Sequence, residues 1–160
     1  MVFGKNFFIV IGFFLLVFLS IYYSYLWRKV DNKKTGLVVL NVLSKDMYDD
    51  CHIEGSINIP MDVMSRAKEI IDKNAEVVTY CSNYLCGASA AARKKLIEMG
   101  FKNVLVYEGG VAEWYQKGFP VKGKKLKPYL KNKVEALKKE KKDYELTAEE
   151  LKAKMGYQAK

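Results

Sequence analysis

The stretch from Glu76 to Leu96 restricts the possible folds more than any other part of the sequence. It reads EVVTYCSNYLCGASAAARKKL: a β-branched run that ends at Cys81, a short loop, and a small-residue run that begins a helix. A strand that leads through a tight loop into a helix is a building block of α/β domains. At such a junction the first helical N–H groups lack backbone partners and the helix dipole is positive. We therefore predict a thiolate with a lowered pKa at Cys81.

The rest of the core alternates between short apolar strands and helices. Leu37–Leu43 is apolar with one polar interruption, as expected of a strand buried on both faces of a parallel sheet. Further strands are expected at residues 57–59, 76–80 and 104–107, and helices at 44–50, 61–73, 88–99 and 111–117. The pattern predicts an α/β domain with a largely parallel sheet. It places Cys81 at the carboxyl end of a strand, where sites in such sheets lie.

The N-terminal region contains a long uncharged segment, Phe7–Trp27, with aromatic residues at its C-terminal end. A helix of this length spans roughly 31 Å, close to the thickness of the hydrocarbon core of a bilayer. We expect a single-pass transmembrane helix over residues 7–27. The alternatives are a buried helix and a cleaved signal peptide, and the absence of an A-x-A-like cleavage site argues against the signal peptide.

Basic residues are distributed unevenly along the chain. Residues 28–34 contain four of them, whereas only Lys5 and the amino terminus precede the apolar segment, so the positive-inside bias favours a cytoplasmic C-terminal domain over an exported one. The net charge of +9 comes mostly from residues 122–160, which hold 13 lysines and 6 acidic residues. The core carries little net charge and no nucleic-acid-binding motif, and we expect no nucleic-acid partner.

These features divide the chain into five parts. They are a short N-terminal tail at 1–6, the transmembrane helix at 7–27, a basic linker at 28–34, the α/β domain at 35–123 and a lysine-rich helical tail at 124–160. The tail is expected to form two helices, and Thr147 with Glu150 is a capping-box signature for the second. The apolar stripe of the tail could pack on the domain, lie on the membrane or bind a partner, and the sequence does not decide among these three. The lysines of the tail are either solvated or face anionic lipid.

Four motifs of the core resemble the rhodanese domain, a single-domain sulfurtransferase module. They occur in the family's order, and the membrane segment and the tail lie outside them. The motifs are the strand Leu37–Leu43; CHIEGSINIP (Cys51–Pro60), similar to G-H-I-x-G-A-x-N-I-P; VVTYC (Val77–Cys81), where the family has its active-site cysteine; and GFKNVLVYEGGVAEWYQKGFPV (Gly100–Val121). The resemblance implies a three-layer domain with a central, mostly parallel sheet flanked by helices.

The resemblance also implies a mechanism. Cys81 would take a sulfane sulfur from a donor such as thiosulfate, a polysulfide or another persulfide, and a thiol acceptor would then collect it. This is covalent nucleophilic catalysis, and it needs no cofactor. The backbone N–H groups of the loop would hold the persulfide. The loop residues are Ser82, Asn83, Tyr84, Leu85, Cys86 and Gly87.

The loop departs from the common family pattern C-x-x-G-x-R-S. Cys86 stands at the arginine position, and no lysine or arginine occurs between Ser82 and Ala92. A neutral loop favours a persulfide, a polysulfide or a protein-bound donor over thiosulfate. In the first strand, Asn41 and Leu43 replace the acidic and basic residues common in the family. Two hypotheses follow: a membrane-anchored sulfurtransferase, or a non-catalytic rhodanese-like scaffold or thiol–disulfide redox sensor at the membrane.

Cys86 has two interpretations of its own. As a resolving thiol it would attack a persulfide or sulfenate on Cys81 and leave a disulfide. Alternatively it is a small residue at the start of the helix, with its sulfur turned into the core.

The remaining candidate residues have structural interpretations. Cys51, His52, Cys81 and Cys86 could form a zinc ligand set, but adjacent ligands at 51 and 52 are poorly spaced, and we expect no metal. We expect His52 to order its loop by hydrogen bonding and Cys51 to be a buried small side chain, with a long-range disulfide as the alternative if the domain is exported. Asp62 and Glu108 are expected to cap helices, Trp114 to lie in the core, and Gly109–Gly110 to form a tight turn.

Overall fold

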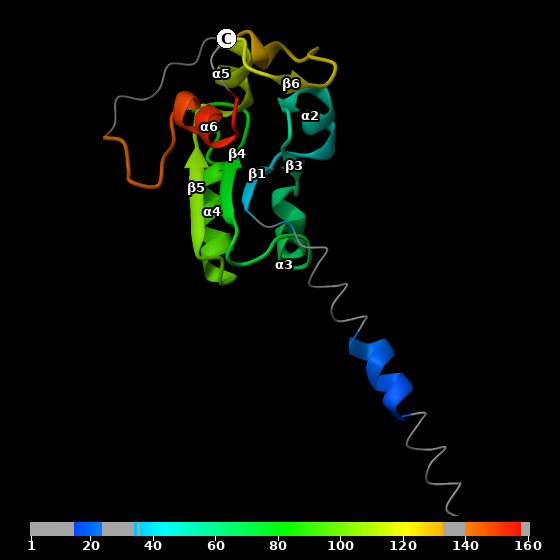
Figure 1. Cartoon of the computed structure of the whole chain (residues 1–160). Helices are drawn as coiled ribbons and strands as arrows, with labels where there is room; N and C mark the ends of the chain where they lie inside the picture. The colour runs from blue at the N-terminus through cyan, green and yellow to red at the C-terminus, as the bar shows by residue number, and fades with distance from the viewer. Residues whose placement is uncertain (1–14, 24–33, 35, 133–139, 158–160) are drawn as a thin grey trace, which may run out of the picture. The chain divides into compact units, whose positions relative to one another are not determined.

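The computed structural model describes residues 15–23, 34, 36–132 and 140–157 (Figure 1). The chain divides into two compact units, residues 1–33 and residues 34–160. In the first unit residues 15–23 are helical, while residues 7–14 and 24–27 of the expected transmembrane helix lie outside the described ranges. Within those ranges, no helix combines the length and the apolar character needed to cross a bilayer.

The second unit is built on a four-stranded parallel sheet with the strand order β3-β1-β4-β5 (Figure 1). The strands are β1 (Leu37–Asn41), β3 (Ile57–Asn58), β4 (Glu76–Tyr80) and β5 (Asn103–Tyr107). Strand β4 lies between β1 and β5, and four of its five residues are buried, which explains its continuous β-branched run. The predicted parallel sheet is confirmed.

The helices flank this sheet. They are α2 (Lys45–Asp50), η1 (Met61–Arg66), α3 (Ala67–Ile70), α4 (Ala88–Glu98), α5 (Gly110–Gln116), η2 (Pro128–Leu130) and α6 (Ala148–Lys154). The single helix expected over residues 61–73 is wrong. The backbone of Val63 leaves the helical region with φ −110° and ψ 23°, and Ile71 is extended because it forms a parallel bridge with Lys34. A 3₁₀ segment and one short α-helix result.

A second, two-stranded antiparallel sheet was not expected from the sequence. It joins β2 (His52–Ile53) to β6 (Val121–Lys122). Two residues in each strand are too few to give an alternating pattern that could be recognised along the chain.

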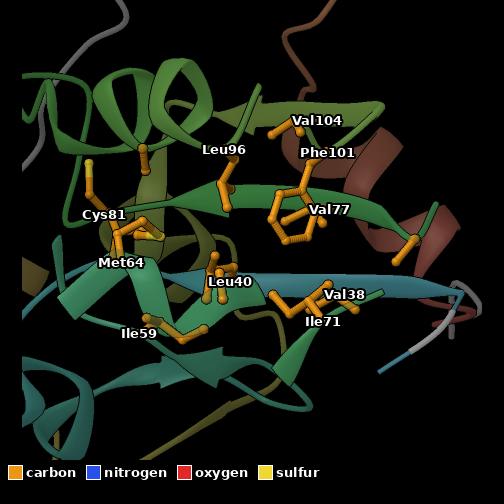
Figure 2. Close-up of a cluster of buried hydrophobic side chains, with 14 residues drawn as sticks. Val38, Leu40, Ile59, Met64, Ile71, Val77, Cys81, Leu96, Phe101 and Val104 are labelled. Atoms are coloured by element: carbon orange, nitrogen blue, oxygen red, sulfur yellow. The ribbon is translucent and has the colours of Figure 1, made fainter. Parts of the chain in front are cut away.

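Two hydrophobic clusters lie on opposite faces of the parallel sheet, because alternate strand residues point to opposite sides. The aliphatic cluster contains Val38, Leu40, Met64, Val77 and Leu96, together with Cys81 (Figure 2). The aromatic cluster contains Tyr80, Tyr107 and Trp114, together with residues of the C-terminal segment. Trp114 is fully buried, as predicted. The sheet is therefore the middle of three layers.

The C-terminal segment packs on the aromatic cluster through Leu130, Ala148 and Leu151, all of which are buried. The N–H of Leu146 donates to the carbonyl of Val106 at 2.8 Å, so the segment continues along the edge strand β5. The capping box predicted at Thr147 is present at the start of α6. The first helix expected in the tail is described only as the turn η2, and residues 133–139 lie outside the described ranges.

Candidate functional site

The candidate site lies at the carboxyl end of β4. Cys81 follows the strand directly, residues 82–87 form the loop, and α4 begins at Ala88. Cys81 is fully buried and belongs to the aliphatic cluster, where Figure 2 shows it at one end, near Met64. Cys86 is only partly buried. The structure therefore places both predicted cysteines in one loop, and Cys81 is more deeply buried than Cys86.

The surroundings of the Cys81 sulfur favour a thiol. Its S–H donates to the carbonyl oxygen of Cys86 at 3.0 Å, the carbonyl of Asn83 lies 3.8 Å away, and the Ser89 hydroxyl lies at 3.5 Å. The hydrogen bond between the two cysteine side chains raises the pKa of Cys81, and burial raises it further. The expectation of a lowered pKa at Cys81 is wrong, because the neighbouring Cys86 side chain and burial outweigh the side-chain and backbone hydrogen bonds of Ser89, which act in the opposite direction.

The start of the helix acts on Cys86 instead. The hydrogen bond from the Cys81 side chain lowers the pKa of Cys86 to about 5 against the opposing effect of burial, and the N–H groups of Ala88 and Ser82 contribute in the same direction. The two neighbouring thiols ionise as a pair, and the surroundings of Cys86 are those that favour the negative charge. The physical argument for an activated thiol at the strand–helix junction holds, but it applies to the second cysteine.

Backbone N–H groups of helix α5 hold the loop in place. The N–H of Val111 donates to the carbonyl of Cys81 at 3.0 Å, and that of Ala112 donates to the carbonyl of Ser82 at 2.9 Å. Gly110 has φ +61°, and a Cβ there would lie 2.6 Å from the Cys81 oxygen. The tight turn predicted at the two glycines therefore allows a backbone-to-backbone contact that fixes the position of the loop.

A carboxylate holds the tip of the loop. The hydroxyl groups of Tyr84 and Tyr107 donate to the same Glu113 oxygen at 3.0 and 2.9 Å. Burial, together with the negative charge of Glu113, raises the pKa of both tyrosines. This network was not expected from the sequence, because Tyr84 and Glu113 lie far apart along the chain and no local pattern relates them.

A pocket of about 900 Å³ opens at the same edge of the sheet. The ends of β1 and β3, helix η1 and Ala88 line it, and most of the lining side chains are apolar. Arg66 supplies one cationic side chain, and Lys45, which is paired with Asp49, supplies another. The loop itself has no cation, and these two residues lie on elements far from Cys81 in the sequence, so no local pattern indicates them. Asp62 also lines the pocket, so its charges are mixed, and the apolar part of the lining suits a small organic group.

The other predicted site residues lie elsewhere. Cys51 is fully buried in the aromatic cluster, on the face of the sheet opposite Cys81. His52 orders its loop as expected: its Nδ1 lies 2.7 Å from the carbonyl of Tyr48, and the two rings stack at 3.8 Å. Across the described ranges, no three His, Cys, Asp or Glu side chains are grouped so that they could hold a metal ion.

Comparisons with known proteins cover this region. The model of the rhodanese-like domain family matches residues 23–117. The thiosulfate sulfurtransferase GlpE of Coxiella burnetii is 32% identical over 88 residues, which are 55% of this chain and 78% of that protein. The centrosomal protein of 41 kDa of Danio rerio is 32% identical over 92 residues, 52% of this chain and 24% of that protein.

Solved structures show the same architecture. The Rhodanese_3-like domain of the Alr3790 protein from Anabaena sp. has a TM-score of 0.51 at 27% identity, covering 55% of this chain and 93% of that chain. The BH2092 protein of Bacillus halodurans has a TM-score of 0.53 at 22% identity, covering 66% and 87%, and this likeness concerns the fold alone. The residues matched by the family model include the sheet, the cysteine loop and α5.

Proposed function

The chain belongs to the rhodanese-like domain family, and we propose that it is a membrane-anchored sulfurtransferase that carries a sulfane sulfur as a persulfide on Cys81. The observation that carries this proposal is the pair of cysteines in the loop after β4, where the Cys81 S–H donates to the carbonyl oxygen of Cys86 at 3.0 Å and where Ala88, at the start of α4, helps to line a pocket. The similarity to a protein named as a thiosulfate sulfurtransferase agrees with it.

The proposed reaction consists of two displacements on sulfur. A cysteine thiolate attacks the sulfane sulfur of the donor, a new S–S bond forms, and the remainder of the donor leaves with the electron pair of the broken bond. A thiol acceptor then attacks the outer sulfur of the persulfide, and the cysteine thiolate is regenerated. No electrons enter or leave the system, and no cofactor is required.

The pocket suits a small organic substrate. Its lining is largely apolar, Arg66 supplies a positive charge that the loop lacks, and Lys45 and Asp62 add charges of both signs, with Lys45 paired to Asp49. A low-molecular-weight organic persulfide or thiol with a carboxylate satisfies both features, whereas thiosulfate would use only the charges.

The membrane anchor is part of the proposal. Residues 15–23 form a helix whose side chains, among them Leu16 and Phe18, are exposed and largely apolar. This helix lies inside the uncharged segment 7–27, and we propose that the segment spans the membrane with the C-terminal domain in the cytoplasm. A reporter fused to the C-terminus tests the orientation: activity of a reporter that works only outside the cytoplasm would contradict it.

A non-catalytic role is the second candidate. Complete burial of Cys81 and its hydrogen bond to a carbonyl both oppose direct attack on a donor, and both favour a scaffold or a redox-sensing thiol pair. In that case oxidation would join Cys81 and Cys86, and no sulfur would be transferred.

The decisive experiment measures sulfur uptake and transfer by the full chain. The protein is incubated separately with thiosulfate, sodium polysulfide and glutathione persulfide, and intact mass spectrometry then detects the gain of one sulfur atom. We expect uptake in the wild type and in the control Cys51→Ala, and none in the double variant Cys81→Ser/Cys86→Ser. Transfer to cyanide, measured as thiocyanate, is expected to require Cys81. A wild type that takes up no sulfur and forms only a disulfide would instead establish the redox role.

A further inference from the structure

The two sulfur atoms of the loop differ in access to solvent. Cys81 is fully buried and lies in the aliphatic cluster, whereas Cys86 is partly buried, next to the first turn of α4. Leu85, directly before Cys86, is 71% exposed, so the loop is open on the Cys86 side. A donor that approaches from solvent therefore meets Cys86 before Cys81.

The hydrogen bonds of the loop also favour Cys86 as the thiol that meets the donor first. The Cys81 S–H donates to the carbonyl oxygen of Cys86, so its proton is held inside the loop. Cys86 lies directly before the first turn of α4 (Ala88–Glu98), where the unpaired N–H groups and the positive end of the helix dipole stabilise a negative sulfur at the outer position.

We propose that Cys86 is the nucleophile that takes the sulfane sulfur from the donor, and that the sulfur then passes inward to Cys81. This inference rests on the sulfurtransferase function proposed above. It changes the role of Cys86 from a thiol that resolves the intermediate to the thiol that forms it. The donor class is an organic persulfide, because its organic part suits the apolar lining of the pocket, which reaches Ala88 two residues after Cys86.

In the first step the Cys86 thiolate attacks the outer sulfur of the donor R–S–SH. The bond from Cys86 Sγ to this sulfur forms, the S–S bond of the donor breaks, and R–S⁻ leaves with the electron pair. The donor proton goes to the departing thiolate, so that Cys86–S–S⁻ and R–SH remain.

In the second step the sulfur moves between the two cysteines. The Cys81 thiol gives its proton to the terminal sulfur of Cys86–S–S⁻, which makes Cys81 a thiolate and the persulfide an electrophile. Cys81 attacks the terminal sulfur, the S–S bond to Cys86 breaks, and Cys86 leaves as a thiolate. The products are Cys81–S–SH and Cys86–S⁻, so the charge and the electrons balance without an oxidant.

Backbone hydrogen bonds fix the position of the loop that carries the two sulfurs during this transfer. Val111 and Ala112 hold the carbonyl groups of Cys81 and Ser82, and the Ser89 hydroxyl lies 3.5 Å from Cys81 Sγ. The hydroxyl of Ser89 can donate to the Cys81 sulfur once that sulfur has lost its proton.

The test compares single cysteine variants of the full chain in a single-turnover reaction with glutathione persulfide. We expect Cys81→Ser to take up one sulfur on Cys86 at close to the wild-type rate, since serine retains a hydrogen-bond donor. We expect Cys86→Ser and Cys86→Ala to take up sulfur at least about tenfold more slowly, because the remaining thiol is buried among carbonyl acceptors. Cys51→Ala is the matched control, and circular dichroism confirms that each variant is folded.

The outcomes separate the two proposals. If both Cys86 variants take up sulfur on Cys81 at the wild-type rate, the inward transfer is wrong while the sulfurtransferase function stands. If Cys81→Ser takes up no sulfur although it is folded, the inward transfer is also wrong. If the wild type takes up no sulfur from any donor, the sulfurtransferase function fails, and the transfer between the cysteines fails with it.

Discussion

The two faces of the parallel sheet are built from different side chains and hold the cysteine loop in different ways. The aliphatic cluster is closed by Met64, Leu96 and similar residues, and Cys81 fits into it as a small apolar side chain would. The aromatic cluster is held by directional contacts: Trp114 donates to the carbonyl of Pro120 at 2.9 Å, and Tyr80 donates to the buried Ser56 hydroxyl or accepts from it at 2.8 Å.

This difference explains how a buried thiol can be kept in place. The aliphatic face supplies a dry environment for the Cys81 sulfur but no directional contact to its backbone. The aromatic face supplies α5, whose N–H groups hold the loop carbonyls, and Trp114 anchors α5 in the core. One face therefore holds the Cys81 sulfur, and the other fixes the loop that carries it. The variants below test this division.

Trp114→Ala should have the largest effect on stability. The side chain is fully buried and makes edge contacts with Tyr107 at 6.0 Å and Phe119 at 5.0 Å. Its removal leaves a large cavity, and we expect a loss of about 3–5 kcal/mol in the free energy of unfolding. Urea denaturation of the full chain measures it. The control Leu126→Ala removes a side chain that is 76% exposed and should change the value by less than about 0.5 kcal/mol. Equal effects would show that the aromatic cluster does not anchor the fold.

Alkylation should separate the two sulfurs on the aliphatic side. Because the pKa of Cys86 is lowered to about 5, its thiolate forms as the pH rises through that value, and its reaction with iodoacetamide should be nearly constant above neutral pH. Cys81, whose pKa is raised, should react at least about a hundredfold more slowly at pH 7. Peptide mass spectrometry after timed quenching measures both rates.

Cys81→Ala is the matched variant for the pH dependence of Cys86 alkylation. It removes the hydrogen bond that contributes most to the lowered pKa of Cys86, so the midpoint of the alkylation profile should move to higher pH. Cys51→Ala should leave the midpoint unchanged. A wild-type midpoint near the ordinary thiol value of about 8.5 would contradict the assignment of the thiolate to Cys86.

The sequence was sufficient to predict the sheet and the position of the cysteine loop, because these follow from local patterns. The β-branched run before Cys81 and the small residues of α4 each form their element from neighbouring residues. The choice between the two thiols was not predictable in this way. It depends on which side chain turns into the core and on whether carbonyl or N–H groups face each sulfur.

Contacts between distant residues account for the remaining errors. Ile71 leaves the expected helix because it pairs with Lys34, and the cations of the pocket come from two elements outside the cysteine loop. The C-terminal segment contains helical patterning, but only the folded core shows that Leu151 is buried against the aromatic cluster. Patterns in the sequence give the elements; they do not give the partners of side chains far apart in the chain.

Gly110→Ala should weaken the support of the loop with an intermediate effect on stability. The new Cβ would lie 2.6 Å from the Cys81 oxygen and from the Ser82 carbonyl carbon, at a φ of +61°. We expect a loss of about 2–3 kcal/mol, from the left-handed backbone and from displacement of the loop. The rate of sulfur uptake should fall together with the stability.

Gly118→Ala is the matched control for this change. Its φ is +69°, but no atom lies within 4 Å of the added Cβ, so only the backbone term of about 1 kcal/mol applies and sulfur uptake should be unchanged. If the two alanine variants lose the same stability and keep the same uptake, the contact between α5 and the loop does not position the thiols.

Glu113→Gln should have the smallest effect, because it preserves the shape of the side chain. The carboxylate oxygen accepts from both Tyr84 and Tyr107, and the loss of its charge should cost about 1–2 kcal/mol in the free energy of unfolding. The negative charge opposes ionisation of the two hydroxyls. Without it the pKa of each tyrosine should fall, although burial, the larger cause, remains. Absorbance titration of tyrosinate in the full chain measures the shift.

The exposed residue Glu98 on α4 provides the control for Glu113. Glu98→Gln removes the same charge from the helix on the aliphatic side and should leave both the tyrosine titration and sulfur uptake unchanged. Glu113→Gln should slow sulfur uptake a few-fold, since Tyr84 lies in the loop two residues before Cys86 and loses its charged anchor. Unchanged uptake, with the expected shift in the tyrosine titration, would show that the anchor at Tyr84 stabilises the aromatic side without influencing the thiols. In that case only the contacts of α5 with the backbone at Cys81 and Ser82 would link the two faces of the sheet.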